Sequence, residues 1–508
     1  MTSIKTKTFS QFELIAYCLI PVLFVAIYFR IFFTNYAYLD EIHQLWHNDD
    51  NSNFVMFHSQ GRWLAGLLFQ KLFSSISTID QIKFLRWFSF SGWVVAAFTW
   101  AIVFKKWVEL FNLVEELWLL SVVYIVCCIS VCVYVGWASC MEVFLAAIFG
   151  LFSTHILFIN LFRQRGKGQL ISGVIPGTLI FGLISLFIYQ PAFGIFLVPF
   201  LLRYIQSGKA RPDRALIIGI GFYLAIYIIY YLVFKYLLRV YNLEASTRTQ
   251  VHFNILKKIS FFFSGPFPQG FSMNLLFYAG SIFSQVFYPA VFLLWLIISF
   301  KRNRWKNFMQ FVFFVPFILL MLALIYLPSM IAAENFPSYR TLFVFNLTVF
   351  LMVSDSLFYL IKKEKARKIF TILGIAWLLL TGFYAFNMQY IIPLKKEFGV
   401  LREFFEKNYK PSMTSIYFIR ADKFLFSPEF HTKVYRDEFG APSTYRDWVP
   451  EPIVKQMIFE LTGKRAVAEK TLVKQFENRV AFDQAATQIT DSSNLVIDMN
   501  LLFNQKLR

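Results

Sequence analysis

The chain has 508 residues, of which 57% are hydrophobic and 20% aromatic, and its mean hydropathy is +0.56. This composition excludes a soluble globular protein of this length, because several windows exceed the roughly 18 apolar residues that mark a membrane-spanning helix. A formal charge of +19 would suggest nucleic-acid binding in a soluble protein, but here Lys and Arg stand in short blocks between apolar runs, as membrane topology requires.

Eleven apolar runs are predicted to cross the membrane as helices. The stretch 170–203 is the ambiguous part, because Pro176, Pro191 and Pro199 favour either two short helices or one broken helix. The first run is too long for the apolar region of a signal peptide, so we expect an uncleaved first helix. The predicted spans lie near residues 12–33, 84–104, 116–136, 140–162, 170–189, 190–203, 215–238, 276–299, 308–328, 340–361 and 369–390.

Basic blocks predict how these helices are oriented. They are "KTK" (5–7), "KK" (105–106), "RQRGK" (163–167), "RYIQSGKARPDR" (203–214), "KRNRWK" (301–306) and "KKEKARK" (362–368). With eleven spans and a cytoplasmic N-terminus, every block falls on the cytoplasmic side, as the positive-inside rule requires. The outer side then holds the loops 34–83, 239–275 and 329–339 and everything after Pro393.

The last 115 or so residues differ from the rest in composition. They are charged and contain two strand-like pieces, "TSIYFIRA" (414–421) and "NLVIDM" (494–499), with helical patterns between them. We therefore expect an all-α polytopic membrane domain at 1–393, followed by a small soluble α/β domain at 394–508. The five cysteines lie in apolar runs without metal-binding spacing, which predicts free buried thiols.

The stretch "YLDEIHQLWHNDD", which begins at Tyr38, places acids and histidines directly after the first apolar run. His43 and His47 would share one helix face with Asp40, as zinc ligands do, but Gln44 stands where the zinc-peptidase pattern needs a glutamate base. A solvated loop is a second interpretation. An acid/base centre is the third, because a carboxylate at a membrane-edge cavity can accept a proton from a hydroxyl.

The run that follows favours the third interpretation. "SQGRWLAGLLFQKLF" (59–73) is amphipathic, with Arg62 and Trp63 at its start, and is predicted to lie in the membrane interface. Acids held near such a helix would face a polar cavity rather than lipid. Asp40 and Glu41 point to different faces, so one can act while the other orients.

The order of these features resembles a known family. An acidic pair straight after the first helix, then "GRWL" and an interfacial helix, is similar to the GT-C class of polyprenyl-phosphate-sugar glycosyltransferases, and within it to the Gtr-type O-antigen glucosyltransferases. Further matches are "LFIYQPAF" (186–193), "ENFPSYRTL" (334–342) and "YRDEFGAPSTYRDWVP" (435–450), so the resemblance spans nearly the whole chain. The motifs are short, and the family more often shows two aspartates where this chain has Asp40 and Glu41.

The resemblance implies an enzyme that transfers a sugar, with inversion of its anomeric configuration, at the outer face of the bacterial inner membrane. The donor would be undecaprenyl-phosphate-glucose, and the acceptor a hydroxyl of a surface glycan such as the O-antigen of lipopolysaccharide. Asp40 would deprotonate the acceptor while Glu41 assists or orients. No cofactor is implied. Participation of a divalent cation stays open, although the sequence shows no convincing ligand set. A flippase and a donor synthase are the implied protein partners, and nucleic acid is not one.

Arginines on the outer side are the candidates for binding the leaving phosphate. Arg62 and Arg340 are best placed, because a guanidinium binds phosphate bidentately, although arginines at helix ends also serve as interface anchors. Weaker candidates for phosphate binding, which would equally well contact lipid headgroups, are Arg248, Lys257 and Lys258.

Other polar residues are candidates for contacting the sugar. Glu142 would bind a sugar hydroxyl or form a buried pair. Tyr189 and Gln190 stand at a predicted helix break. They would either bind sugar hydroxyls or form a polar kink between two helices. Glu334 would pair with Arg340 or touch substrate. His43, Trp63 and Tyr339 complete the predicted substrate-binding set.

Three other kinds of protein remain as alternatives. A transporter or flippase for lipid-linked sugars usually shows repeated halves with matching broken helices, which this chain lacks. A glycan polymerase or ligase usually carries a large outer loop between late spans rather than acids after the first. In a non-catalytic docking protein the acidic pair would be dispensable.

Overall fold

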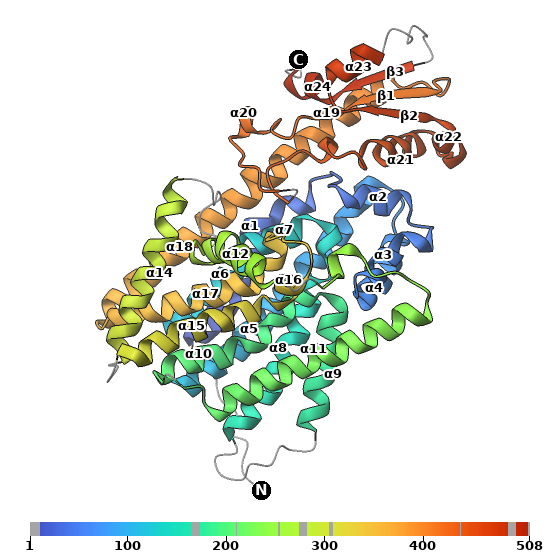
Figure 1. Ribbon diagram of the computed structural model, residues 1–508. Helices are drawn as coiled ribbons and strands as arrows, with labels where there is room; N and C mark the ends of the chain where they lie inside the picture. The colour runs from blue at the N-terminus through green and yellow to red at the C-terminus, as the bar shows by residue number, and fades with distance from the viewer. Residues whose placement is uncertain are drawn as a thin grey trace.

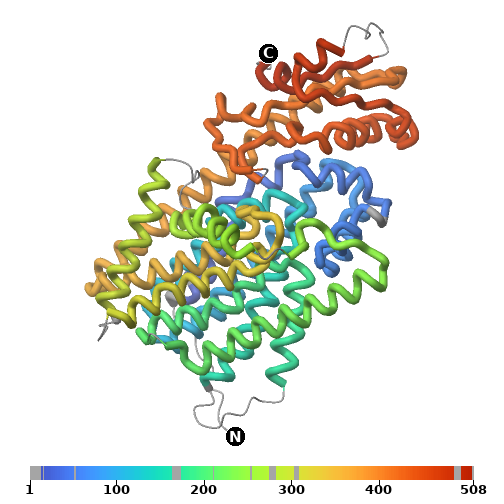
Figure 2. The backbone as a smooth tube through the Cα atoms, in the orientation of Figure 1, coloured from blue at the N-terminus to red at the C-terminus, as the bar shows by residue number. Residues whose placement is uncertain are grey.

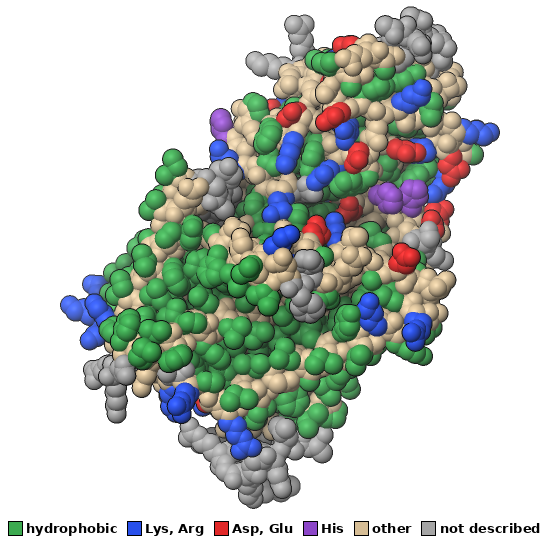
Figure 3. Space-filling view, in the orientation of Figure 1, with side chains coloured by type: hydrophobic (Ala, Val, Ile, Leu, Met, Phe, Trp, Pro, Cys, Tyr) green, Lys and Arg blue, Asp and Glu red, His purple; other side chains and the backbone are tan. Residues whose placement is uncertain are grey.

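The computed structural model describes residues 11–163, 173–209, 211–251, 254–273, 282–303, 308–436, 438–485 and 494–505. A large body of helices occupies the lower part of Figure 1, and a smaller part with helices and strands lies above it. Figure 3 shows hydrophobic side chains over the helical body, whereas acidic and basic side chains gather over the upper part. These features support a helical membrane protein that crosses the bilayer several times.

The elements of the body are mostly long apolar helices. They are α1 (Gln11–Tyr28), α2 (Asp40–Trp46), α3 (Val55–Ser59), α4 (Trp63–Phe73), α5 (Ile82–Phe111), α6 (Glu115–Cys127), α7 (Ile129–Gly136), α8 (Val143–Arg163), α9 (Val174–Ile188), α10 (Val198–Ser207), α11 (Arg214–Val240), α12 (Ile255–Ser264), α13 (Pro266–Phe271), α14 (Ile282–Asn303), α15 (Phe308–Ile325), α16 (Leu327–Ile331), α17 (Tyr339–Leu360), α18 (Glu364–Phe383) and α19 (Ile392–Asn408).

Seven helices among the described residues are long and apolar enough to cross a membrane, and the bent pair α6–α7, with 41° between its halves, would be an eighth. The other three expected spans correspond to the shorter apolar helices Ala16–Phe32 and Val174–Ile188 and to the segment 190–203. The count of eleven therefore stays a prediction. The block 5–7, residues 164–167 of the block 163–167 and residues 304–306 of the block 301–306 lie outside the described residues, as do residues 170–172 and the start of the expected span 276–299.

In the ambiguous stretch, the described residues 173–203 form two helices with a break between them. α9 ends at Ile188, a 3-10 helix covers Gln190–Leu197, and α10 follows. Tyr189 has extended backbone, and Pro191 stands at the beginning of the new helix, where its missing N–H costs no hydrogen bond. The predicted break is thus confirmed and lies at Tyr189.

A continuous helical run, Glu364–Asn408, carries the chain from the body to the upper part (Figure 2). Three parallel strands there form a sheet in the order β2-β1-β3. The elements are β1 (Ser415–Ile419), α20 (Ser427–Phe430), α21 (Pro450–Thr462), α22 (Arg465–Lys470), β2 (Leu472–Phe476), α23 (Arg479–Ala485), β3 (Asn494–Asp498) and α24 (Met499–Asn504).

Two of these strands, β1 and β3, were predicted and are confirmed. β2 was missed because it is an edge strand with much of its surface exposed, so "LVKQF" carries no continuous apolar run. All five cysteines are free. The expected burial is wrong for Cys18, which is exposed because α1 presents one of its faces at the outside of the helical body.

Candidate functional site

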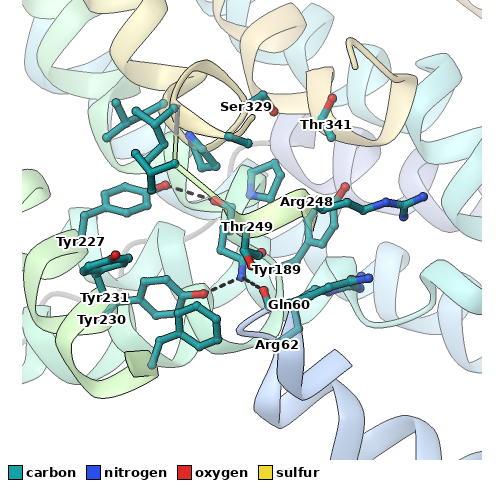
Figure 4. A pocket seen from close by; sticks show the side chains of 18 of the residues that line it. Gln60, Arg62, Tyr189, Tyr227, Tyr230, Tyr231, Arg248, Thr249, Ser329 and Thr341 are labelled. Atoms are coloured by element: carbon teal, nitrogen blue, oxygen red, sulfur yellow. Dashed lines mark hydrogen bonds between the residues drawn. The ribbon is translucent and has the colours of Figure 1, made fainter. Parts of the chain in front are cut away.

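A cavity of about 700 Å³ lies where the loop 60–62, the helix break at Tyr189, α11 and residues 327–341 meet (Figure 4). Its α11 wall is apolar and aromatic, formed by Leu224, Tyr227, Ile228, Tyr230, Tyr231, Leu232 and Phe234. Three arginines, Arg62, Arg248 and Arg340, also line it. Figure 4 shows the tyrosines of α11 on one side and Arg62 and Arg248 on the other. The cavity is therefore amphipathic, with an apolar wall and a cationic wall.

Arg62 directly precedes α4, and contacts with its guanidinium hold the side chain in place. Its guanidinium pairs with the carboxylate of Glu142, donates from Nε to the carbonyl of Ile188 at 3.3 Å, and lies 5.0 Å from the ring centroids of both Phe57 and Tyr189. Glu142 is fully buried and is not among the cavity-lining residues. Of the two roles predicted for Glu142, the structure contains the buried pair.

Arg340 stands in the first turn of α17 and is fixed in a comparable way. It pairs with Glu438, a fully buried carboxylate that also accepts the backbone N–H of Tyr339 at 2.7 Å. The guanidinium lies 4.4 Å from the ring centroid of Trp137 and 3.8 Å from the sulfur of Cys140. Its side chain keeps 23% exposure, so part of the guanidinium can still meet a ligand in the cavity.

Asp40 is the first residue of α2 and is half-buried. Burial raises the pKa of its carboxyl above the ordinary value, while the charges of Arg340, Arg248 and His43 and a hydrogen bond from Trp448 oppose that rise. The carboxylate thus lies within electrostatic reach of two of the arginines that line the cavity.

The backbone that presents Asp40 is strained. Leu39 has φ 47° and ψ −114°, a left-handed conformation that is unfavourable for a residue with a branched side chain. Its N–H donates to Ser443 Oγ at 2.8 Å, so a residue of the C-terminal part holds this turn in place. Strain of this kind persists only where the surroundings enforce it, and it is common at functional sites.

Glu41 is fully buried and its oxygens are already bonded. The carboxylate accepts the N–H of Tyr38 at 2.8 Å and the N–H of Ala138, and it pairs with the buried Arg86. Arg86 in turn donates to the carbonyls of Gly136 and Tyr36, both at 3.0 Å. Glu41 therefore anchors α2 to α5 and to the turn after α7. Asp40 is not among the residues that line the cavity, but of the two acids it is the one whose charge interacts with Arg340 and Arg248.

Tyr189 and Gln190 are brought to the cavity, as predicted, but they differ in availability. Tyr189 lies beneath the Arg62 guanidinium. The Gln190 amide donates to the Gln60 carbonyl at 2.9 Å and to the Tyr230 hydroxyl at 2.6 Å, so it ties the loop before α4 to α11. The polar-kink alternative describes Gln190 better than sugar binding does.

Glu334 lines the cavity but its predicted pairing with Arg340 is absent. It lies 3.4 Å from Arg248 instead, with both side chains exposed, because Arg340 is already paired with Glu438. Tyr339 is buried and packs on Tyr435, with 4.1 Å between ring centroids.

His43 and Trp63 do not line the cavity. His43 packs against His47, with 4.6 Å between ring centroids, and Trp63 stacks on His58 at 4.2 Å. Within the described ranges, no three His, Cys, Asp or Glu side chains are grouped closely enough to hold a metal ion.

Two residues that hold parts of this site in place, Glu438 and Arg86, were not predicted from the sequence. Glu438 lies inside the quoted motif 435–450, yet nothing local indicates that it meets Arg340 98 residues away. Arg86 lies inside an apolar run, and a charge in such a run is itself a signal of a buried partner. The position of Arg86 indicated a buried ion pair but did not identify Glu41 as the partner.

Fold and site together define a polytopic helical membrane protein with an amphipathic cavity and a half-buried aspartate near its cationic wall. Comparison with known protein families, with curated proteins and with solved structures gives no match to this chain. Its function therefore has to be argued from the site.

Proposed function

We propose that this protein is an inverting glycosyltransferase of the GT-C type, which moves a sugar from undecaprenyl-phosphate-sugar to a hydroxyl of a surface glycan such as the O-antigen of lipopolysaccharide. The observation that carries the proposal is the division of the cavity into an apolar wall along α11 and a wall with three arginines. A polyprenyl-phosphate-sugar has the same division, with a hydrocarbon chain at one end and a sugar joined through an anionic phosphodiester at the other.

Arg62 and Arg340 would bind the phosphate. Both are held by buried glutamates, so the two guanidinium groups keep their places before the ligand arrives. Preorganised charge stabilises developing charge without reorganisation during the reaction. As the polyprenyl phosphate leaves, the electron pair of the breaking bond between the anomeric carbon and oxygen goes to the phosphate oxygen, and these arginines would stabilise the resulting charge.

Asp40 would be the general base. It would take the proton of the acceptor hydroxyl while the hydroxyl oxygen forms its bond to the anomeric carbon on the face opposite the phosphate, which inverts the configuration. The raised pKa of Asp40 makes it a better proton acceptor than an ordinary aspartate. Glu41 would orient α2 through its pair with Arg86 rather than exchange protons.

The finer topology belongs to the same proposal. Eleven spans with a cytoplasmic N-terminus would place the cavity at the outer face of the bacterial inner membrane and residues 394–508 in the periplasm. The positive-inside rule supports this orientation. Glucose as the sugar, and a flippase and a donor synthase as partners, follow from the family resemblance alone.

A reconstitution separates this proposal from the runner-up, a transporter of lipid-linked sugars. The purified protein is placed in liposomes with radiolabelled undecaprenyl-phosphate-glucose and a lipid-linked oligosaccharide acceptor. Label transferred to the acceptor, with release of undecaprenyl phosphate, supports the transferase. Movement of intact donor between leaflets without transfer supports the transporter. A polymerase or ligase would instead consume pyrophosphate-linked glycan as donor.

A further inference from the structure

A second, smaller cavity of about 380 Å³ lies next to the amphipathic cavity. It is lined by Lys257, Ser260, Phe261, Ser264, Gly265, Asn335, Pro337 and Arg436. Four elements of the structure therefore contribute to it: α12, the turn into α13, the segment before α17 and the segment after β1. None of these residues lines the larger cavity.

One extended segment separates the two cavities. Residues 334, 336 and 338 line the larger cavity, whereas residues 335 and 337 line the smaller one. This alternation is what an extended chain produces, because successive side chains point to opposite sides. The two cavities thus share a wall that is one chain thick.

The smaller cavity is rich in hydrogen-bond donors. Lys257 and Arg436 bring positive charge, and no acidic residue is found among the described residues that line it. Asn335 Oδ1 accepts a hydrogen bond from Lys258 Nζ at 2.6 Å, so its carbonyl is occupied and its amide N–H group is left to donate. Cations and donors without a lining carboxylate favour an anion.

Arg436 is placed by its backbone and by an aromatic contact. Its φ of 52° is in the left-handed region, which is uncommon for a residue other than glycine. The guanidinium lies 4.2 Å from the ring centroid of Phe336, a residue of the shared wall. This contact supports the flat face of the guanidinium, whose edge can then donate to a ligand.

The surface of α12 beside this cavity is apolar. Ile255, Leu256, Ile259 and Phe263 are exposed, at 70%, 79%, 49% and 47%. A helix with such a face and a lysine at its edge is typical of a membrane interface. An anion that reaches the cavity from this side would therefore belong to an amphiphile.

We propose that the smaller cavity binds the phosphate group of a second amphiphile, held by Lys257, Arg436 and Asn335 and separate from the ligand of the larger cavity. Two sources share this chemistry: the headgroup of a bilayer phospholipid and the pyrophosphate of a lipid-linked glycan. The proposal concerns binding and does not depend on the transfer reaction.

The test compares the full-length protein with Lys257→Gln/Arg436→Gln. Lys235→Gln/Arg239→Gln is the matched control, because it removes the same charge from two exposed residues of α11 that line neither cavity. Bound phosphatidylglycerol is counted by native mass spectrometry after release from nanodiscs of phosphatidylglycerol and phosphatidylcholine. Affinity for inorganic pyrophosphate is measured by calorimetry in detergent.

We expect the site variant to lose about 10- to 100-fold in affinity, as the removal of charge-assisted hydrogen bonds predicts, while the control keeps wild-type affinity. Loss of both phosphatidylglycerol and pyrophosphate binding identifies a general phosphate site. Loss of phosphatidylglycerol alone assigns the site to bilayer lipid, and loss of pyrophosphate alone assigns it to a lipid-linked glycan. If neither ligand is lost, or if the control loses as much, the proposal is wrong.

Loss of binding can be distinguished from misfolding of the variant and from failure of the proposed function. Lys257→Gln alone changes one exposed side chain and replaces the double variant if that variant does not fold. A protein that binds phosphate through these residues but transfers no sugar would refute the proposed function and leave this site intact.

Discussion

Arg340, in the first turn of α17, forms an ion pair with Glu438, a fully buried carboxylate 98 residues further along the chain. The same carboxylate accepts the N–H of Tyr339, so it fixes both the side chain of the arginine and the start of its helix. Glu438, in the segment between α20 and α21, thus holds Arg340, which lines the cavity.

Glu438→Gln should weaken this placement. The amide keeps the shape of the side chain but removes the charge, and Arg340 loses its counter-ion. We expect kcat/KM for the donor to fall by about 10- to 100-fold, as for the loss of one charge-assisted hydrogen bond. Glu438→Asp, which keeps the charge, should recover part of this loss. Unchanged kinetics in the Gln variant would show that the ion pair does not position Arg340.

Lysine substitutions test how the phosphate is bound. Arg62→Lys and Arg340→Lys keep the charge but lose the planar fork of donors that holds both the glutamate partner and a phosphate. KM for the donor should rise by about tenfold or more in each. Arg302→Lys is the control, because Arg302 also pairs with a carboxylate, that of Asp355 at 2.5 Å, but lies outside the cavity lining. An equal rise of KM in Arg302→Lys would contradict a specific role of Arg62 and Arg340 in binding the donor.

The Glu41–Arg86 pair should be important for stability. Both side chains are fully buried, so Glu41→Gln leaves an uncompensated buried guanidinium and should destabilise the protein by about 3–5 kcal/mol. Replacing both partners, as in Glu41→Gln/Arg86→Met, should recover part of that loss. Thermal unfolding in detergent measures both effects. Full stability in Glu41→Gln would contradict the anchoring role.

The pH dependence of the rate should report Asp40. Its pKa is raised above the ordinary value of 3.8, so the base form is lost at a higher pH than for an exposed aspartate. The acid limb of kcat/KM should therefore lie above that value and be absent from the residual activity of Asp40→Asn. A limb at or below the ordinary value would argue against Asp40 as the base.

The same shift has a consequence for stability. A carboxyl whose folded-state pKa is raised contributes stability that is present below its unfolded-state pKa and is lost as pH rises through the folded-state value. At neutral pH the ionised Asp40 is therefore a net cost, and Asp40→Asn should unfold at the same temperature as wild type or a higher one. Loss of activity in that variant is then separable from misfolding.

Local patterns in the sequence were enough to predict much of the fold. The long apolar helices could be predicted because each run is apolar on its own, and β1 and β3 because they are short buried runs. The edge strand β2 could not, since two of its five side chains, Lys474 and Gln475, are polar and exposed.

The site could be predicted only in part. The sequence identified Arg62, Tyr189, Glu334 and Arg340, which do line one cavity. The two adjacent acids look alike in the residue pattern, and only the family resemblance favoured Asp40 as the base. The pair between Glu41 and the buried Arg86 could not be predicted. Pairs formed by residues far apart in the sequence, such as Arg62 with Glu142, depend on packing and leave no local trace.

The most direct test of the central claim is the rate of sugar transfer from undecaprenyl-phosphate-glucose by wild type and Asp40→Asn. The Asn variant keeps the shape of the side chain and removes the base, so the account predicts that kcat falls by about 10²- to 10⁴-fold while donor binding and folding are retained. Normal turnover in a folded Asp40→Asn protein would contradict the acid/base role of Asp40 and, with it, the proposed mechanism.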